Sequence, residues 1–269
     1  MNKPLQKNQQ QMHTAIVTGA YGAIGKAIAE GLAEKGYKLF MLGRDQGVLE
    51  EARKDIVQKT GNEHVEIHAL DLSREGEIRS LAEQWVGPLH LLINNAAATP
   101  RTRQETPEGI EMQFATNVLG YFWMIKHFSP FMEGQPDARI VNVASYWAGD
   151  LRLDDMEFKK RPYHNDTAYR QTKQADRMLT AAYARRLQEK HIAVLAAHPG
   201  DVNSKLSNNL GYGGWESPEK GADTPLFCAT DPALNGATGK YFEHRKETPC
   251  PFAADSQAVE KLFQLCEGY

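Results

Sequence analysis

Cysteine is scarce in this chain of 269 residues, and the shortage excludes proteins that depend on disulfides or zinc for their fold. Cys228, Cys250 and Cys266 are too few and too widely spaced for a disulfide framework, and no CxxC spacing occurs. Because free thiols persist in a reducing compartment, we predict a cytoplasmic protein. We expect no metal site.

Long hydrophobic runs are absent as well. The longest apolar stretch, Val118 to Ile125, is far shorter than the roughly 18 residues that a membrane-spanning helix needs. The glutamine-rich residues 1–12 lack the apolar segment of a secretory signal. We therefore expect no membrane span, a flexible polar tail at residues 1–12 and a single domain at residues 13–269.

Neither sign of charge is in excess. The chain has 31 Lys and Arg residues against 34 Asp and Glu residues, for a net charge of -3. This balance gives no indication of a nucleic-acid partner. Hydrophobic residues make up 41% of the chain and charged residues 24%, which is typical of a globular protein with a sizeable core and excludes a disordered one.

From His13 onward, short apolar or β-branched runs alternate with segments of helical periodicity. This alternation predicts a Rossmann-type α/β fold, a doubly wound parallel sheet with helices on both faces. Asp45 and Ser73 have the positions of helix N-caps, and Asp166 or Thr167 can cap a later helix. We expect strands at residues 15–17, 37–42, 65–70, 89–93, 139–143 and 192–197, and helices that begin near Gly22, Asp45, Ser73, Thr106 and Asp166.

Residues 203–217 are rich in glycine, serine and asparagine and also contain Tyr212 and Trp215. The segment is long for an ordinary connection, and it combines glycines that can act as hinges with apolar aromatic rings. It therefore predicts a substrate lid. A disordered surface loop would have a similar composition.

A glycine-rich turn follows the first predicted strand and leads into a helical pattern. Small residues let such a turn tighten, so that backbone N–H groups at the start of the helix can approach a diphosphate. Close packing alone would also explain them. The candidate cofactor residues in this turn are Gly19, Tyr21, Gly22, Ala23, Ile24 and Gly25.

The second predicted strand ends without an acidic residue. NAD sites of this kind place an acid about 20 residues after the glycine motif, where it binds the ribose 2′-hydroxyl. Here Gly43 and Arg44 follow Leu42, and a guanidinium can bind a 2′-phosphate through two hydrogen bonds. We therefore predict NADP(H) rather than NAD(H), although Arg44 could also be a solvated loop residue paired with Asp45.

Polar residues also follow the third and fourth predicted strands. Asp71, next to Leu72, could accept a hydrogen bond from an adenine amino group or form a turn before Ser73. Asn95 and Ala96 could line the nucleotide, or the asparagines here could lock neighbouring strand ends together. For Asp71 and for the asparagines, the sequence leaves both roles open.

Tyr169 and Lys173 are four residues apart, which places them on one face of a predicted helix. An ammonium group close to a phenol stabilises the phenolate, so that the phenol can exchange protons nearer neutral pH. Ser145 follows the predicted strand at residues 139–143, so its hydroxyl should lie at the same edge of the sheet. These three residues are the strongest candidates for catalysis.

The order of these motifs resembles the short-chain dehydrogenase/reductase family over nearly the whole chain. The family's glycine motif matches Thr18-Gly19 and Ile24-Gly25, its Asn-Asn-Ala-Gly motif matches residues 94–96, and its Pro-Gly motif matches Pro199-Gly200. Its catalytic tetrad matches Asn117, Ser145, Tyr169 and Lys173. Residues 43–45, 184–187 and 239–242, with the long interval between Ser145 and Tyr169, are similar to the retinol-dehydrogenase and carbonyl-reductase-like branch.

The resemblance implies hydride transfer between NADP(H) and a carbonyl compound or a primary or secondary alcohol. Tyr169 would be the general acid and base, and Ser145 would hydrogen-bond the reacting oxygen. Lys173 would lower the pKa of Tyr169 and bind the nicotinamide ribose, while Asn117 would hold a water molecule. The implied cofactor residues are Gly19, Tyr21, Gly22, Ala23, Ile24, Gly25, Arg44, Asp71, Leu72, Asn95, Ala96, Tyr169, Lys173, Pro199, Gly200 and Val202.

The substrate is predicted less closely than the reaction. Beside Ser145, the aromatic residues Tyr146, Trp147, Tyr212 and Trp215 could form an apolar pocket, or they could pack within their loops. We expect a small and largely apolar carbonyl or alcohol as the partner. A homo-oligomer that pairs through the helices near Thr106 and Asp166 is also compatible with the resemblance.

The chain departs from the family pattern at three points. Ala23 and Ala97 stand where glycine is usual, and their methyl groups narrow the approach of the backbone to the cofactor. The hydrophobic anchor of membrane-bound retinol dehydrogenases is missing, which favours a soluble enzyme that acts on another carbonyl. Two alternatives stay open, namely an NADP-binding redox sensor or scaffold without turnover, and a reductase of conjugated carbon–carbon double bonds.

Overall fold

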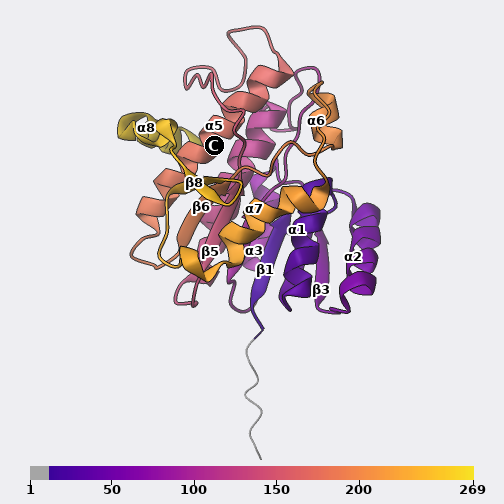
Figure 1. Ribbon diagram of the computed structural model, residues 1–269. Coiled ribbons are helices and arrows are strands. Elements are labelled where there is room, and N and C mark those ends of the chain that lie inside the picture. The colour runs from indigo at the N-terminus through magenta and orange to yellow at the C-terminus, as the bar shows by residue number, and fades with distance from the viewer. Residues whose placement is uncertain (1–11) are drawn as a thin grey trace, which may run out of the picture.

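The computed structural model describes residues 12–269, so residues 1–11 of the predicted tail lie outside the described part of the chain. Eight strands of this part form one sheet in the order β3-β2-β1-β4-β5-β6-β7-β8 (Figure 1). All neighbours are parallel except β7 and β8. The strands are β1 (Thr14–Thr18), β2 (Lys38–Gly43), β3 (Val65–Ala69), β4 (Leu91–Asn94), β5 (Arg139–Val143), β6 (Ala193–Ala197), β7 (Lys240–Glu243) and β8 (Lys246–Thr248).

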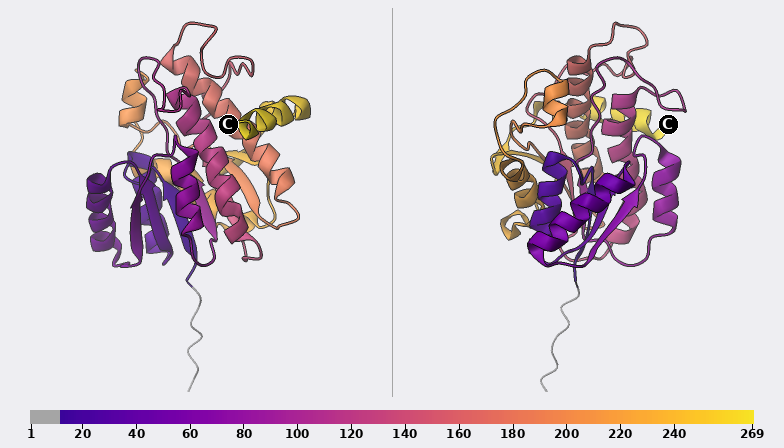
Figure 2. Two further views of the ribbon diagram at one scale, coloured as in Figure 1. Left: turned by 180° about the vertical axis from the view of Figure 1, so that it is seen from behind. Right: turned by 90° about the vertical axis from the view of Figure 1, so that its right-hand side faces the viewer.

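Helices cover both faces of the sheet. Figure 1 shows α1 and α7 in front of it, and the view from behind in Figure 2 shows α4 and α5 crossing the opposite face. The doubly wound fold predicted from the sequence is thereby confirmed. The helices are α1 (Ala23–Glu34), α2 (Gln46–Thr60), α3 (Glu75–Glu83), η1 (Phe114–Leu119), α4 (Gly120–Phe128), η2 (Ser129–Met132), α5 (Asn165–Arg186), α6 (Lys205–Asn209), α7 (Pro218–Thr230), η3 (Pro232–Leu234), η4 (Pro251–Ala253) and α8 (Ser256–Glu267).

The core consists of two large apolar clusters, one on each face of the sheet. Alternate residues of β1 enter different clusters, because successive side chains of a strand point to opposite faces. Ile16 packs with residues of α3, α4, α5 and α8, whereas Ala15 and Val17 pack with residues of α1, α2 and α7. Burial on both faces explains why the strands read as continuous apolar runs in the sequence.

The six strands expected from the sequence correspond to β1 through β6, with ends that differ by at most two residues. The predicted N-cap Asp45 is confirmed, since its carboxylate accepts a hydrogen bond of 3.0 Å from the backbone N–H of Val48. The cap at Ser73 is wrong. Ser73 hydrogen-bonds Asp71 through both its backbone N–H and its hydroxyl, and α3 begins after Arg74.

Two further helix starts also differ from the expectation. The backbone N–H of Thr106 bonds the carbonyl of Ile110, so this segment is a turn and the helical region begins several residues later. Helix α5 begins at Asn165 after His164, which places both predicted caps, Asp166 and Thr167, within the first turn. An acidic side chain there still interacts favourably with the helix dipole.

The helical region before α4 contains a π-helical segment, η1, with Asn117 in its interior. In a π-helix each backbone hydrogen bond joins residues that are five apart, so the segment contains one residue more than an α-helix with the same hydrogen bonds. Such segments are frequent at functional sites. All six residues of η1 are buried. The segment therefore presents Asn117 to the interior at the carboxyl edge of the sheet.

Across residues 12–269, none of the helices is both long enough and apolar enough to cross a membrane.

Candidate active site

The turn between β1 and α1 is packed too tightly for larger residues at two of its glycines. Gly19 has a φ of +63°, and a Cβ atom there would lie 2.8 Å from the Cα of Ala96. A Cβ atom on Gly25 would lie only 2.2 Å from the carbonyl oxygen of Gly19. The first N–H groups of α1 have no partner within the helix, so they are available at this edge of the sheet. The turn thus has the shape and polarity of a diphosphate cradle.

Thr18 and Asn95 lock the carboxyl ends of β1 and β4 together. The hydroxyl of Thr18 accepts hydrogen bonds from the backbone N–H groups of Asn95 and Ala96, at 2.8 and 3.1 Å. The side-chain amide of Asn95 donates to the carbonyl oxygen of Thr18 at 2.9 Å. Of the two roles that the sequence left open for Asn95, the structure shows the locking role, and Ala96 forms the wall opposite Gly19.

The region beyond β2 carries an exposed cation. Arg44 is solvent-exposed, and the neighbouring carboxylate of Asp45 is engaged in capping α2. The ring of Tyr21 lies over Gly43, where an added Cβ atom would meet it at 2.3 Å. Arg44 is therefore free to meet a phosphate next to the glycine-rich turn.

Asp71 and Leu72 follow β3 at the same edge. The Asp71 carboxylate accepts from the N–H and the hydroxyl of Ser73, at 3.0 and 2.8 Å. Its own N–H donates to the carboxylate of Glu77 at 2.6 Å. The turn role that the sequence left open for Asp71 is thus present, and the buried Leu72 packs in the core.

Ser145 and Tyr169 come from different elements and meet at the carboxyl edge of the sheet. Ser145 lies two residues beyond β5, and its hydroxyl accepts from the N–H of Trp147 at 3.0 Å. Tyr169 lies in the second turn of α5 and is 6% exposed. Burial raises the pKa of the Tyr169 phenol above its usual range, while the Ser145 hydroxyl acts in the opposite direction. The phenol is therefore protonated at neutral pH, as a general acid must be.

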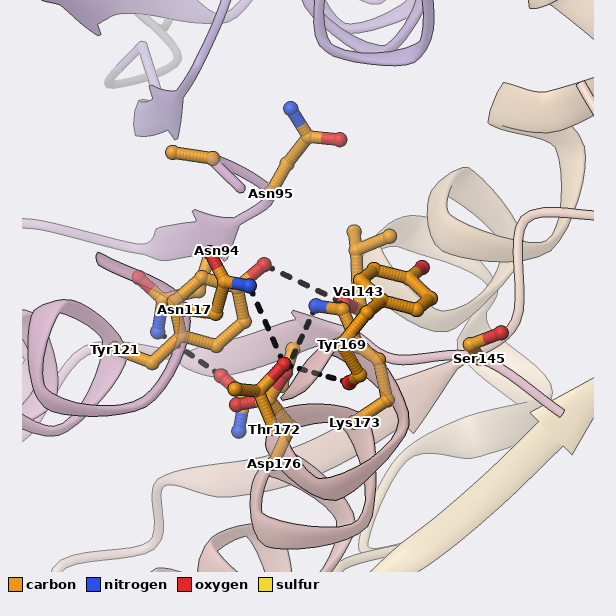
Figure 3. Close-up of polar contacts among 12 residues, drawn as sticks. Asn94, Asn95, Asn117, Tyr121, Val143, Ser145, Tyr169, Thr172, Lys173 and Asp176 are labelled. Carbon is orange, nitrogen blue, oxygen red and sulfur yellow. Dashed lines mark hydrogen bonds and ion pairs between the residues drawn. The ribbon is translucent and has the colours of Figure 1, made fainter. Parts of the chain in front are cut away.

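Lys173, one helical turn beyond Tyr169, makes two close contacts. Its ammonium donates to the backbone carbonyl of Val143 at 2.9 Å and to the carboxylate of Asp176 at 2.8 Å (Figure 3). It also lies 5.8 Å from the centre of the Tyr169 ring. Burial opposes the charge on Lys173, but Asp176 and Tyr121 outweigh burial and keep the pKa of Lys173 above its ordinary value. Lys173 is thus a buried cation beside the phenol.

Asn117 connects the loop after β4 with α5. Its side-chain oxygen accepts from the N–H of Ala98 at 2.7 Å, and its amide donates to the Ala98 carbonyl at 3.1 Å and to the Thr172 hydroxyl at 3.2 Å. Thr172 stands next to Lys173 in the helix. Asn117 therefore fixes the position of the helix turn that carries Lys173.

Residues 203–217 form a folded flap over this edge. Val202 pairs with Glu216 in a short bridge, and the Ser204 and Ser207 side chains form a capping box at the start of α6. In Figure 1, α6 lies beyond the carboxyl ends of the strands. The carboxylate of Glu216 accepts from the N–H of Asp201 at 2.6 Å, close to the Gly200 backbone. Pro199, Gly200 and Val202 are thus joined to the base of the flap.

The aromatic residues proposed for the substrate fall into two groups. The Trp147 ring lies 5.3 Å from that of Tyr212 in the flap and 6.2 Å from that of Tyr169. The ring centre of Tyr146 lies 4.7 Å from that of His198, and Tyr146 is half exposed, whereas Trp215 is 79% exposed. The structure therefore brings Trp147 and Tyr212 close to Tyr169 and leaves Trp215 at the surface.

Comparisons with known proteins agree with this geometry. The family model described as short chain dehydrogenase matches residues 13–213. The chain belongs to the short-chain dehydrogenase family. It is 33% identical to human retinol dehydrogenase 13 over 271 residues, which cover 93% of this chain and 82% of that protein. The predicted family and its retinol-dehydrogenase-like branch are both confirmed.

Two solved structures extend the comparison. An uncharacterized protein from Mycobacterium paratuberculosis matches with a TM-score of 0.79 and 27% identity, over 95% of this chain and 92% of the other. A 3-oxoacyl (acyl-carrier-protein) reductase from Agrobacterium tumefaciens, solved with NADP bound, matches with a TM-score of 0.69 and 26% identity, over 86% and 92%. This short-chain dehydrogenase is therefore an oxidoreductase of the family, and it acts on a small molecule.

The residue that sequence reasoning missed is Asp176. It is completely buried, and its carboxylate forms the ion pair with Lys173. The only signal in the sequence was the spacing of three residues between the two, which is common among exposed pairs on helix surfaces. This pair differs from such surface pairs because both Lys173 and Asp176 are buried at the candidate site.

Proposed function

We propose that this short-chain dehydrogenase is an NADP(H)-dependent oxidoreductase that transfers hydride between the nicotinamide and a carbonyl compound or a primary or secondary alcohol. One observation carries the proposal: the buried Tyr169 lies beside Lys173 and near Ser145, at the edge of the sheet where β1 turns into α1. Ligands of doubly wound folds bind at this edge.

The residues present fit the cofactor. Gly19 and Gly25 have no room for Cβ atoms, so the backbone of the turn can pack closely and approach a diphosphate. Arg44 is exposed beyond β2, where it would hold the 2′-phosphate. Ala23 is the first residue of α1, directly after its N-cap Gly22, so the helix begins within this turn despite the added methyl group. The NADP bound to the Agrobacterium tumefaciens reductase supports this choice by analogy.

The chain's own residues supply acid–base chemistry and orientation, while NADP(H) supplies the hydride when it is bound. In the direction of reduction, the Tyr169 hydroxyl donates its proton to the substrate oxygen as negative charge develops there. The Ser145 hydroxyl donates a hydrogen bond to the same oxygen and holds it in place. The Lys173 ammonium stabilises the phenolate that Tyr169 leaves behind.

An apolar carbonyl compound fits the aromatic wall that Trp147 and Tyr212 form beside Tyr169. The name of the human relative, retinol dehydrogenase 13, points to the same kind of substrate, a molecule with one polar end and a large apolar body. We therefore propose apolar aldehydes and ketones as the substrate class. The cytoplasmic location and a homo-oligomeric state stay predictions.

The proposal is tested by following NADPH absorbance with the purified protein and a panel of aldehydes, ketones and enones, with NADH measured beside NADPH. We expect oxidation of NADPH with apolar aldehydes or ketones. Tyr169→Phe should lower kcat by roughly 10²-fold or more, because the proton donor is lost, and should leave NADPH affinity nearly unchanged. Tyr37→Phe, which changes a tyrosine just before β2, is the matched control and should keep its activity.

Three outcomes would overturn the proposal. Full turnover by Tyr169→Phe would remove the tyrosine from the mechanism. Tight NADPH binding without turnover of any compound would favour the redox sensor or scaffold. Turnover of enones alone would favour reduction of the carbon–carbon double bond.

A further inference from the structure

A buried carboxylate contacts the lysine of the candidate site. Asp176 is 0% exposed and Lys173 is 2% exposed. The Lys173 ammonium lies 2.8 Å from the Asp176 carboxylate and 2.9 Å from the carbonyl of Val143, the last residue of β5 (Figure 3). The ammonium is therefore held by the carboxylate of Asp176 and by the end of β5 at the same time.

Asp176 is costly to keep at this position. Among the described residues, its Oδ1 atom has no hydrogen-bond partner, and Lys173 is its only ion-pair partner. Burial raises the pKa of Asp176 to about 7, against the attraction of Lys173. Apolar residues of similar volume generally stabilise a core at least as well as such a pair. A role in stability alone does not explain this aspartate.

The titratable groups around the pair come from several elements. Tyr169 precedes it on α5, Tyr121 reaches it from α4 with the ring centre 5.0 Å from the Lys173 ammonium, and Cys266 faces Asp176 from α8. Tyr169 also faces Tyr146 after β5, Asp201 after β6 and Tyr212 in the flap. Among the described residues, Lys173 is the only cation that forms an ion pair with Asp176.

The two charges have opposite effects on Tyr169. A cation beside a phenol stabilises the phenolate, and an anion nearby destabilises it. Asp176 accordingly adds to the rise in the pKa of Tyr169. An ammonium group also has only three N–H donors, and Val143 and Asp176 occupy two of them. One donor is left for any other partner.

We propose that Asp176 is a positioning residue, which holds the Lys173 ammonium against β5 and cancels part of the positive charge that Lys173 presents to Tyr169. The proposal rests on the function proposed above, in which Tyr169 exchanges the proton. In this proposal, the pKa of Tyr169 depends on Lys173 and Asp176, which lie on the following turns of α5. Asp176 touches neither substrate nor cofactor, so it acts only through Lys173.

The first test is the pH dependence of kcat/KM in both reaction directions. Asp176→Asn keeps the shape of the side chain and removes its charge. We expect the pH profile governed by Tyr169 to move to lower pH by about one unit or more, because the opposing negative charge is lost. Asp150→Asn is the matched control, since Asp150 is an exposed aspartate of the loop before α5 whose carboxylate lies 2.8 Å from the guanidinium of Arg170 on that helix. The pH profile of this variant should match that of the unaltered protein.

The proposal would be overturned if the pH profile of Asp176→Asn had the same shape and position on the pH axis as that of the unaltered protein. If Asp176→Asn lowers activity by the same factor at every pH, the residue has only a structural role. Thermal unfolding shows whether Asp176→Asn is folded. If Asp176→Asn does not fold, Asp176→Ser is measured instead. The serine variant is also neutral, so the same movement of the profile is expected.

The second test does not depend on turnover. In protein labelled with ¹³C at the lysine ε-carbon, the signal of Lys173 is the one missing from the spectrum of Lys173→Arg. We expect it to titrate at lower pH in Asp176→Asn than in the unaltered protein, and identical titration curves would overturn the ion-pair role. Absence of NADPH binding and turnover in the unaltered protein would instead overturn the proposed function, while the lysine titration still reports on Asp176.

Discussion

Arg44 is the single residue on which the expected cofactor choice depends. It is exposed at the end of β2, and the one acidic neighbour in the chain, Asp45, caps α2. We expect Arg44→Asp to weaken NADPH binding by about 10- to 100-fold, because a charge-assisted contact of roughly 1.5–3 kcal/mol is replaced by repulsion. NADH binding should change little or improve. Fluorescence titration with both cofactors measures the difference.

Arg53→Asp serves as the control for that substitution, because Arg53 lies on the surface of α2 and pairs with Glu50 of the same helix. An equal loss of affinity for NADPH and NADH in Arg44→Asp would show that Arg44 does not read the 2′-phosphate.

At the scale of single residues, the sequence predicted the polar groups better than their environment. Tyr169 and Lys173 could be predicted because their spacing on a helix is fixed by the backbone. Asp176 could not, because its importance depends on burial under α4 and α8, which no local pattern encodes. The locking role of Asn95 likewise depends on Thr18, which lies 77 residues earlier in the chain.

At the scale of elements, the turn between β1 and α1 makes unequal demands on its glycines. A Cβ atom on Gly25 would meet the carbonyl oxygen of Gly19 at 2.2 Å, whereas one on Gly22 would lie 3.4 Å from the same oxygen. Gly22 also has an ordinary φ of -71°. We expect Gly25→Ala to lower the free energy of unfolding by about 1–3 kcal/mol, because the backbone of the turn must shift.

Urea unfolding of both variants measures this difference, with Gly22→Ala as the matched control that stays close to the unaltered protein. NADPH affinity should fall with Gly25→Ala, because the cradle moves with the turn. Equal stability of the two variants would contradict the close packing of Gly25 against Gly19.

The elements that the sequence predicted well are those with a strong apolar pattern. Strands β1 through β6 could be located to within two residues, and all of them except the partly exposed β3 are buried over almost their whole length. Strand β8 has no buried residue and pairs only with β7, so its three residues give no such pattern. The helix expected near Thr106 failed for a different reason, because a turn closed by Ile110 replaces the first helical hydrogen bonds.

At the scale of the whole molecule, buried ionisable groups of opposite kinds shape the dependence of stability on pH. Burial, His244 and Arg177 lower the pKa of His198 to about 4. The folded state therefore favours neutral His198, and this contribution to stability is complete above pH 6.5 and is lost as the pH falls toward 4. Burial raises the pKa of Glu111 to about 7, so the contribution of Glu111 is complete below pH 4.5 and is lost as the pH rises through 7.

We expect His198→Gln to show this balance. Between pH 7 and pH 4.5 the unaltered protein should lose up to about 3 kcal/mol more of its free energy of unfolding than the variant, because only the unaltered protein must protonate a buried imidazole. Urea unfolding at the two pH values measures the loss. His64→Gln, which changes an exposed histidine, is the control, and an equal loss in His198→Gln and the unaltered protein would contradict the burial argument.

The π-helical segment η1 makes the active site sensitive to the length of the chain as well as to its composition. It contains one residue more than an α-helix would need for the same bonds, and Asn117 lies within it. Loss of a single codon in this stretch would let the helix become regular, and each residue of an α-helix turns by about 100°. The gene could then encode a well-formed helix whose Asn117 no longer reaches Ala98 and Thr172. Insertions and deletions of one residue, which many loops of this protein should tolerate, are thus expected to be selected against here.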